Sequence, residues 1–339
     1  MAAGEFWILA LSGGGARGLF TAQVLANLEK AVGAPLANRF DLIAGTSVGG
    51  ILALGLAKEI PAKELVALFD QADDIFTPRH SYLNWGLLGP KYCNDKLKAL
   101  LEKEEIFGKS TIGNLKHRVM IPSVNYTKGT PTFFKTPHHP RLRVDWEYKL
   151  VDVAMATAAA PTFFPVYGFG NQQFVDGGLV ANAPGLVAVH EAMQFADHPD
   201  VNTIHVVSIG TYARGTAMDP KLDQDIGILL ASSNGWFPWA RGWGSRLFEL
   251  TINSQESMNN NMLKHWLGDR HHLIDGTPKP EQTNYLGLDN TSDESRKALL
   301  GQADVISQEL FSTELLKSIQ GHEPSQPKFY HGPNKNADV

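Results

Sequence analysis

Residues 40–57 read FDLIAGTSVGGILALGLA, and this stretch decides the fold. Residues 40–44 predict a short strand, and residues 51–57 predict an apolar helix, so the glycine-rich residues 45–50 form a tight turn between them. The turn contains Gly45-Thr-Ser47-Val-Gly49, a G-x-S-x-G pattern in which the serine lies on a sharp strand-to-helix bend. The helix N-terminus behind such a serine favours developing negative charge. Ser47 is therefore a candidate nucleophile, with a tight turn and a chemically idle serine as the alternative.

A second strand–turn–helix unit comes earlier in the chain. Residues 6–11 are continuously apolar, residues 13–18 are rich in glycine, and residues 19–32 carry apolar side chains at helical spacing. Two such units within sixty residues predict an α/β fold with a parallel sheet and crossover helices.

The glycine-rich loop, GGGARG at residues 13–18, has two interpretations. Its backbone N–H groups are unobstructed, which suits an oxyanion hole. It also matches the dinucleotide-binding fingerprint, which needs an acidic residue at the end of the next strand. That strand ends in Ala44, and Asp41 lies at its start. The sequence disfavours a non-catalytic dinucleotide-binding protein of the Rossmann type, but this stays an alternative. Arg17 either orders the loop or faces a phosphate.

The remaining chain supplies more helices and strands. A capping box that begins at Thr291 predicts a terminal helix to about residue 319. Asn182 before Ala-Pro184 is typical of a helix N-cap. We expect a catalytic core at 1–215, an extension at 216–320 packed on the core as a lid or activator region, and a loosely ordered tail at 321–339. Further helices are expected at 62–69, 95–103 and 152–160 and from the Asn182 cap through residue 193, and strands at 119–124, 132–135, 173–175 and 203–209.

Composition excludes several classes of protein. Lys and Arg number 30 against 35 Asp and Glu, a net charge of −5, whereas nucleic-acid binders are normally basic. The one cysteine, Cys93, excludes an intramolecular disulfide and a cysteine-based zinc cluster. His190-Glu191 begins a near match to H-E-x-x-H, but Gln194 stands at the second ligand position. We expect no metal and no cofactor, and we expect His138 to lie on the surface.

Neither a secretory signal nor a membrane span is visible in the sequence. No basic segment precedes the apolar run at 6–11, which stops at Ser12. No window approaches the roughly 20 apolar residues of a transmembrane helix. We expect a cytoplasmic protein, which can still act at a membrane surface.

Asp176 is the candidate base. It ends a predicted strand and is followed by Gly177 and Gly178, so its carboxylate can reach a crowded site. None of the twelve histidines lies in a motif that would complete a triad. An isolated Asp-Gly-Gly is more often a simple turn.

Taken together, these motifs resemble the patatin-like phospholipase family, over roughly residues 6–215. The resemblance extends to ATAAAPTFFP at 156–165, to Lys91-Tyr92, to Asn182-Ala-Pro184 and to SIGT at 208–211. It implies a three-layer α/β/α fold with a mostly parallel central sheet. It also implies acyl-ester hydrolysis of membrane phospholipids without a metal, by a protein acting peripherally on the inner membrane.

The resemblance assigns a role to each motif. Ser47 would attack the ester carbonyl and Asp176 would accept its proton directly; partial burial would raise the pKa of this carboxyl and improve it as a base. The oxyanion would be held by N–H groups of Gly13, Gly14 and Gly15, with Val48 as a further donor. Supporting positions are Arg17, Gly18, Gly45, Gly49, Gly177 and Gly178.

Two stretches resemble a narrower group. Residues 8–20 and the late pattern Leu286-Gly-Leu-Asp289 are similar to the cyclic-dinucleotide-activated phospholipases of bacterial antiphage signalling (CBASS). This implies an activator pocket after about residue 215 and a role in antiviral defence; an unregulated lipid or ester hydrolase is the alternative. The Trp236–Trp243 cluster is a candidate lid or membrane contact, or ordinary packing. Candidate phosphate contacts are Arg214, Arg241, Arg246 and Arg270.

Overall fold

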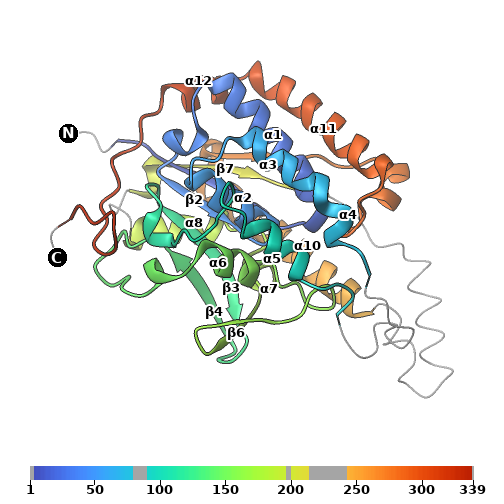
Figure 1. The fold of residues 1–339 in the computed structure, drawn as a ribbon. Helices are drawn as coiled ribbons and strands as arrows, with labels where there is room; N and C mark the ends of the chain where they lie inside the picture. The colour runs from blue at the N-terminus through green and yellow to red at the C-terminus, as the bar shows by residue number, and fades with distance from the viewer. Residues whose placement is uncertain (1–3, 79–89, 196–199, 214–242, 338–339) are drawn as a thin grey trace.

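A mixed sheet forms the centre of the molecule (Figure 1). The computed structural model describes residues 4–78, 90–195, 200–213 and 243–337, with side chains in the last range from residue 247 on. Within these residues the sheet has eight strands in the order β5-β6-β3-β2-β1-β7-β8, and β4 pairs with β3. The strands are β1 (Phe6–Leu11), β2 (Leu42–Gly45), β3 (Val119–Asn125), β4 (Thr130–Lys135), β5 (Tyr167–Phe169), β6 (Gln172–Asp176), β7 (Ile204–Ile209) and β8 (His271–Ile274).

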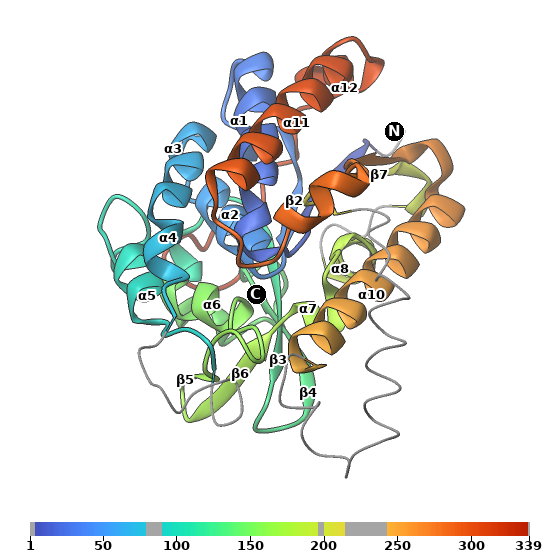
Figure 2. The same cartoon turned by 90° about the vertical axis from the view of Figure 1, so that its right-hand side faces the viewer.

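Five strands that are neighbours in the sheet run parallel: β3, β2, β1, β7 and β8. Strands β4, β5 and β6 extend the sheet by antiparallel pairing. Helices cover both faces, as the two views show (Figures 1 and 2). The helices are α1 (Gly18–Val32), α2 (Val48–Ala57), α3 (Ala62–Ala67), α4 (Ala72–Ile75), α5 (Asp95–Leu101), α6 (Leu150–Thr157), α7 (Gly178–Ala181), α8 (Gly185–Phe195), α10 (Trp243–Leu267), α11 (Asp293–Phe311) and α12 (Glu314–Gly321).

Side-chain alternation along β1 divides the core into two layers. Leu9 and Leu11 pack into the cluster beneath α1, α2 and α6, whereas Ile8 and Ala10 pack into the cluster beneath α8 and α10. A strand buried on both faces is continuously apolar, which is why the run at 6–11 lacks polar residues. The predicted three-layer α/β/α fold with a mostly parallel central sheet is confirmed.

The C-terminal extension is built into this fold. Strand β8 pairs in parallel with β7 and so widens the sheet, and α11 packs along α1. Arg214, Arg241 and most of the Trp236–Trp243 cluster lie outside the described residues.

Two helix predictions were wrong in detail. The terminal helix ends at Phe311 and α12 begins at Glu314, because the Ser312 and Thr313 hydroxyls bond the carbonyls of Glu309 and Leu310. Such local bonds compete with helix continuation. The N-cap of α11 is Ser292, one residue later than the predicted capping box.

Asn182 does not cap a helix through its side chain. Its amide donates instead to the Gly13 carbonyl and to Glu256. The backbone of Asn182 continues directly from α7, with helical φ and ψ angles. The predicted cap was therefore wrong, and this side chain belongs to the glycine-rich loop.

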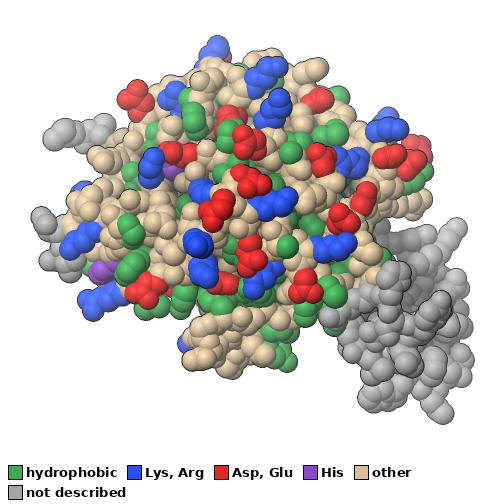
Figure 3. All heavy atoms as spheres, viewed as in Figure 1, with side chains coloured by type: hydrophobic (Ala, Val, Ile, Leu, Met, Phe, Trp, Pro, Cys, Tyr) green, Lys and Arg blue, Asp and Glu red, His purple; other side chains and the backbone are tan. Residues whose placement is uncertain are grey.

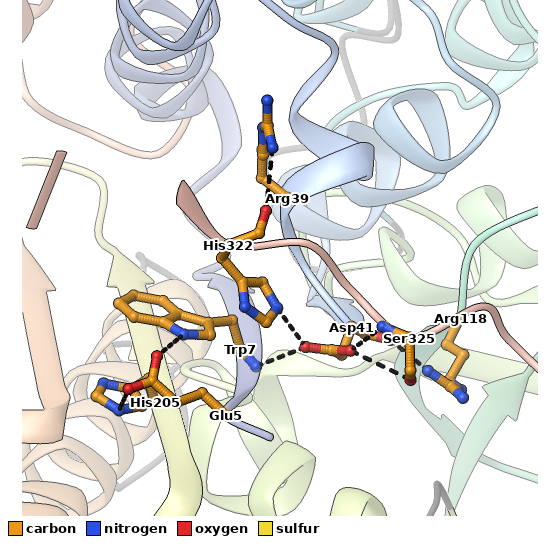
Figure 4. Close-up of polar contacts among 8 residues, drawn as sticks. All are labelled: Glu5, Trp7, Arg39, Asp41, Arg118, His205, His322 and Ser325. Atoms are coloured by element: carbon orange, nitrogen blue, oxygen red, sulfur yellow. Dashed lines mark hydrogen bonds and ion pairs between the residues drawn. The ribbon is translucent and has the colours of Figure 1, made fainter. Parts of the chain in front are cut away.

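The tail returns to the beginning of the sheet, where it differs from the loose segment that the sequence predicted (Figure 4). Buried Asp41 accepts hydrogen bonds from the Trp7 N–H (2.8 Å), the His322 ring (2.8 Å) and the Ser325 N–H (3.1 Å). Further along, Phe329 is 3% exposed. One carboxylate therefore joins β1, the start of β2 and the tail.

The face shown in Figure 3 carries no large patch of only positive or only negative charge, because Lys and Arg side chains are interspersed with Asp and Glu. Among the described residues, no helix is both long enough and apolar enough to cross a bilayer.

Replacing the Asp41 carboxylate should destabilise the fold. Asp41→Ala leaves the Trp7 N–H and its other donors without their buried acceptor, so we expect the free energy of unfolding to fall by about 2–4 kcal/mol. Urea denaturation followed by tryptophan fluorescence measures this. The control is Asp70→Ala, which removes an exposed ion pair with Arg296 and should change stability by less than about 1 kcal/mol. Equal effects of the two substitutions would contradict the role given to Asp41.

Candidate active site

Ser47 lies on a strained bend between β2 and α2. Its φ and ψ of 55° and −127° are unusual for a residue with a side chain. A Cβ at Gly45 would collide with the Gly49 carbonyl, and a Cβ at Gly49 would collide with the Leu11 carbonyl. Only glycine at both positions lets strand and helix meet this closely around the serine.

Asp176 faces Ser47 from the end of β6. The Ser47 hydroxyl donates to Asp176 Oδ2 at 2.7 Å, and the Gly178 N–H donates to Oδ1 at 2.6 Å. The carboxylate is 1% exposed. Burial raises the pKa of Asp176 to about 7, and the two hydrogen bonds oppose this rise in pKa. At neutral pH this carboxyl can both take and return a proton.

Thr157, at the end of α6, positions both partners, a role that the sequence analysis did not assign to it. Its hydroxyl accepts the Ser47 N–H at 3.0 Å and donates to the Pro122 carbonyl at 2.6 Å. Its carbonyl accepts the Gly177 N–H at 3.2 Å. A Cβ at Gly177 would collide with Pro122, which explains this glycine. The sequence signal that could have indicated this role is the presence of a threonine within an alanine-rich helix.

Two of the three glycine N–H groups assigned to the oxyanion hole are free to serve it. The Gly13 N–H donates to the Asn182 carbonyl at 3.1 Å and is already used. Gly14 and Gly15 line the same cavity as Ser47, and within the described residues their N–H groups have no hydrogen-bond acceptor. Gly15 has a φ of +57°, a backbone conformation that favours glycine.

A strap at residues 286–289 lies against this loop. The Leu288 carbonyl accepts the Ala16 N–H at 2.8 Å, and a Cβ on Gly15 would collide with the same carbonyl. Asp289 then binds the Lys91 ammonium at 2.5 Å and the Tyr92 hydroxyl at 2.7 Å. The Ala16 N–H, which a dinucleotide phosphate would need, thus already donates to the Leu288 carbonyl. This argues against the Rossmann alternative.

Arg17 is buried beside the strap. Its guanidinium donates to the Leu286 carbonyl at 3.3 Å, and the carboxylates of Glu256 and Asp275 interact with it electrostatically. This geometry favours the interpretation that Arg17 orders the glycine-rich loop over the interpretation that it faces a phosphate. Gly18 follows at the start of α1, where a Cβ would collide with Val48.

Helix α10 holds the other side of the loop. The Glu256 carboxylate accepts the Ser12 hydroxyl at 3.1 Å and the Asn182 amide at 2.9 Å, and the same amide donates to the Gly13 carbonyl at 3.3 Å. Gln255 accepts the Asn182 N–H at 2.6 Å. These contacts join positions more than seventy residues apart, and nothing local in the sequence indicates them.

An apolar cavity leads away from Ser47 and Asp176. Aliphatic and aromatic side chains from several helices form its walls, so it suits a hydrocarbon chain. Its lining includes Ile51, Leu52, Phe69, Ile75, Phe76, Leu97, Leu100, Leu101, Phe163, Phe164, Phe248, Ile252 and Leu288.

Other candidates lie elsewhere. Arg270 donates to the carbonyls of Val201 and Ile204, which makes it structural rather than a phosphate contact. The Arg246 side chain lies outside the described part of the chain. His138 is buried, not on the surface as expected, because its ring bonds Glu191 at 2.9 Å.

Comparison with known proteins identifies the family. The model of the family described as patatin-like phospholipase matches residues 9–189, and the chain belongs to that family of hydrolases. Three relatives named cGAMP-activated phospholipase are similar to nearly all of it. The relative from Pseudomonas aeruginosa (strain BWHPSA011 / Pa011) is 43% identical, over 98% of this chain and 96% of its own length. That from Escherichia coli (strain TW11681) is 37% identical, over 86% of each chain, and that from Vibrio cholerae serotype O1 is 34% identical, over 90% and 91%.

Detaching the strap should slow the chemical step. Asp289→Ala removes the anchor to Lys91 and Tyr92, so the Leu288 carbonyl and the loop it holds can shift. We expect kcat on a short-chain ester to fall by about tenfold or more with KM changed less than about twofold, since small misplacements reduce rate more than binding. The control is Asp73→Ala, at an exposed carboxylate on α4. An unchanged kcat with a lowered melting temperature would assign the strap to stability alone.

Proposed function

We propose that the chain releases fatty acids from membrane phospholipids through a Ser47–Asp176 dyad, and that a cyclic dinucleotide switches this activity on. The observation that carries the catalytic part is the 2.7 Å hydrogen bond between Ser47 and a buried carboxyl, at the end of an apolar cavity. The family supports the reaction class, and the printed names of three relatives support the activator.

The reaction begins with the acyl chain in the apolar cavity and the ester carbonyl beside Ser47. The Ser47 oxygen attacks that carbonyl while Asp176 takes the hydroxyl proton, the part that histidine plays in a triad. The tetrahedral oxyanion is held by the N–H groups of Gly14 and Gly15. Loss of one such donor typically raises the barrier by about 3–4 kcal/mol.

In the second half of the reaction Asp176 first acts as an acid and then again as a base. Protonated Asp176 returns its proton to the departing alkoxide of the lysophospholipid, which leaves the acyl group on Ser47. Water then attacks the acyl-enzyme, with Asp176 again accepting the proton. As the bond between the Ser47 oxygen and the acyl carbon breaks, Asp176 returns this proton to Ser47 and the fatty acid leaves. A carboxyl whose pKa lies near 7 serves both steps better than one near its ordinary value.

Contact with a bilayer fits the position of α10. Phe248 and Ile252 on this helix line the acyl cavity, and neighbouring Leu247 and Leu250 are 44% and 48% exposed. Apolar side chains beside a cavity mouth can enter the headgroup region of a membrane. A lipase that degrades membranes needs control, which favours a regulated enzyme over an unregulated one.

The test is fatty-acid release from vesicles of phosphatidylethanolamine and phosphatidylglycerol, with and without cGAMP. We expect cGAMP to increase the wild-type rate at least tenfold, and Ser47→Ala to reduce the rate to background, because the nucleophile is gone. Ser318→Ala, at an exposed position on α12, is the matched control and should behave as wild type. Equal turnover by wild type and Ser47→Ala would refute the dyad; turnover indifferent to cyclic dinucleotides would select the unregulated hydrolase.

The rate should also depend on pH through Asp176. The base must be ionised, so we expect kcat/KM to be half-maximal near pH 7, to fall about tenfold per unit below it and to level off above pH 8. Asp176 does not itself favour unfolding in acid, since between about pH 4 and 7 its native carboxyl binds a proton that the unfolded chain has lost, so its contribution to stability rises as the pH falls. Circular dichroism checks this. A flat profile down to pH 5 would contradict the assignment.

A further inference from the structure

A second cavity lies between α10 and the end of β8, apart from the acyl cavity. The two cavities share no lining residue among those the structure describes. The walls of the second cavity are mainly polar, with side chains from one face of α10 and from β8 and its flanking residues. Those used below are Asn253, Glu256, Asn260, Lys264, Asp269 and Asp275.

The chemistry of this lining matches nucleobase edges. Asparagine amides pair with the adjacent donor and acceptor of adenine, and carboxylates accept the N–H donors of a base. The Asn260 side-chain oxygen is buried and has no hydrogen-bond partner within the described residues, which is unusual for a buried polar atom. Lys264 supplies an exposed ammonium at the same cavity, suited to a phosphate.

Three carboxylates among the described residues line this cavity, those of Glu256, Asp269 and Asp275. Burial and the neighbouring Glu256 raise the pKa of Asp275 to about 7, and burial also raises the pKa of Glu256. These carboxylates can accept hydrogen bonds from the N–H donors of a base.

The cavity is connected to the active site through Glu256. This carboxylate lines the cavity and also binds Ser12 and the Asn182 amide, which in turn donates to the Gly13 carbonyl. A ligand donor that takes over Glu256 weakens its hold on Asn182 and so alters the glycine-rich loop beside Ser47. Regulation by this route requires that the ligand bind more tightly to one arrangement of the loop than to another.

We propose that this cavity is the activator site, and that it binds a cyclic dinucleotide with its bases against Asn253, Asn260 and the carboxylates and a phosphate at Lys264. The proposal rests on the proposed function only for the identity of the ligand. It assigns a place and a route of action to the activator, which the relatives' names do not.

Binding of cGAMP to the full chain, measured by calorimetry, tests the site. Lys264→Glu and Asn260→Leu should each raise the dissociation constant at least tenfold, whereas basal hydrolysis of a short-chain ester stays within about twofold. Lys317→Glu on α12 makes the same charge change at an exposed position and should leave binding unaltered. Cyclic di-AMP and cyclic di-GMP, tested alongside, report which bases are preferred.

Hydrogen exchange provides a readout that does not depend on variants. Bound cGAMP should slow amide exchange in residues 250–264 and 271–276 of the wild type. If cGAMP binds but the cavity variants bind it equally and protection appears elsewhere, the site is wrong while the activator stands. If the wild type binds no cyclic dinucleotide, the activator itself is wrong, and this site with it.

Discussion

The buried hydrogen bond between Ser47 and Asp176 constrains much of the surrounding structure. A carboxylate removed from water is unfavourable unless its environment fixes hydrogen bonds to it. Here the two residues come from strands separated by β3, so the register of three strands decides their distance: Ala44 pairs with Met120, and Ser123 pairs with Asp176. The Thr157 hydroxyl and carbonyl then bond both loops, so the sheet and α6 together hold one 2.7 Å contact.

The extension takes part in the site instead of merely covering it. The strap fixes the glycine-rich loop from one side through the Leu288 carbonyl, and α10 fixes it from the other through Glu256 and Asn182. In both contacts the partner of the glycine motif comes from another segment of the chain. An oxyanion loop held by a separate segment can be adjusted by moving that segment, which gives this architecture a route to regulation that a self-contained loop lacks.

The sequence predicted what depends on local pattern. Continuous apolar runs such as 6–11 identified the parallel strands, and the glycines around Ser47 identified the bend, because both signals arise from neighbours in the chain. It could not identify Thr157, Asn182 or Glu256 as positioning groups, since their partners lie far away in sequence. Asn182 was misinterpreted for the same reason: the local rule for caps was applied to a side chain that a tertiary contact had already taken. The sequence also did not reveal that Asp41 forms hydrogen bonds with both β1 and the tail.

The choice of glycine at each motif position follows from crowding more than from flexibility. At Gly45, Gly49 and Gly177 the obstacle to a side chain is the backbone carbonyl of another segment, which cannot move aside. At Gly15 both a collision with the strap and a positive φ apply. These carbonyls belong to β1, β3, α2 and the strap, so a side chain at any of these glycines would separate the segments that form the site. The motif glycines therefore bring Ser47, Asp176 and the proposed oxyanion donors close together, which is why they lie at strand ends and not in ordinary surface turns.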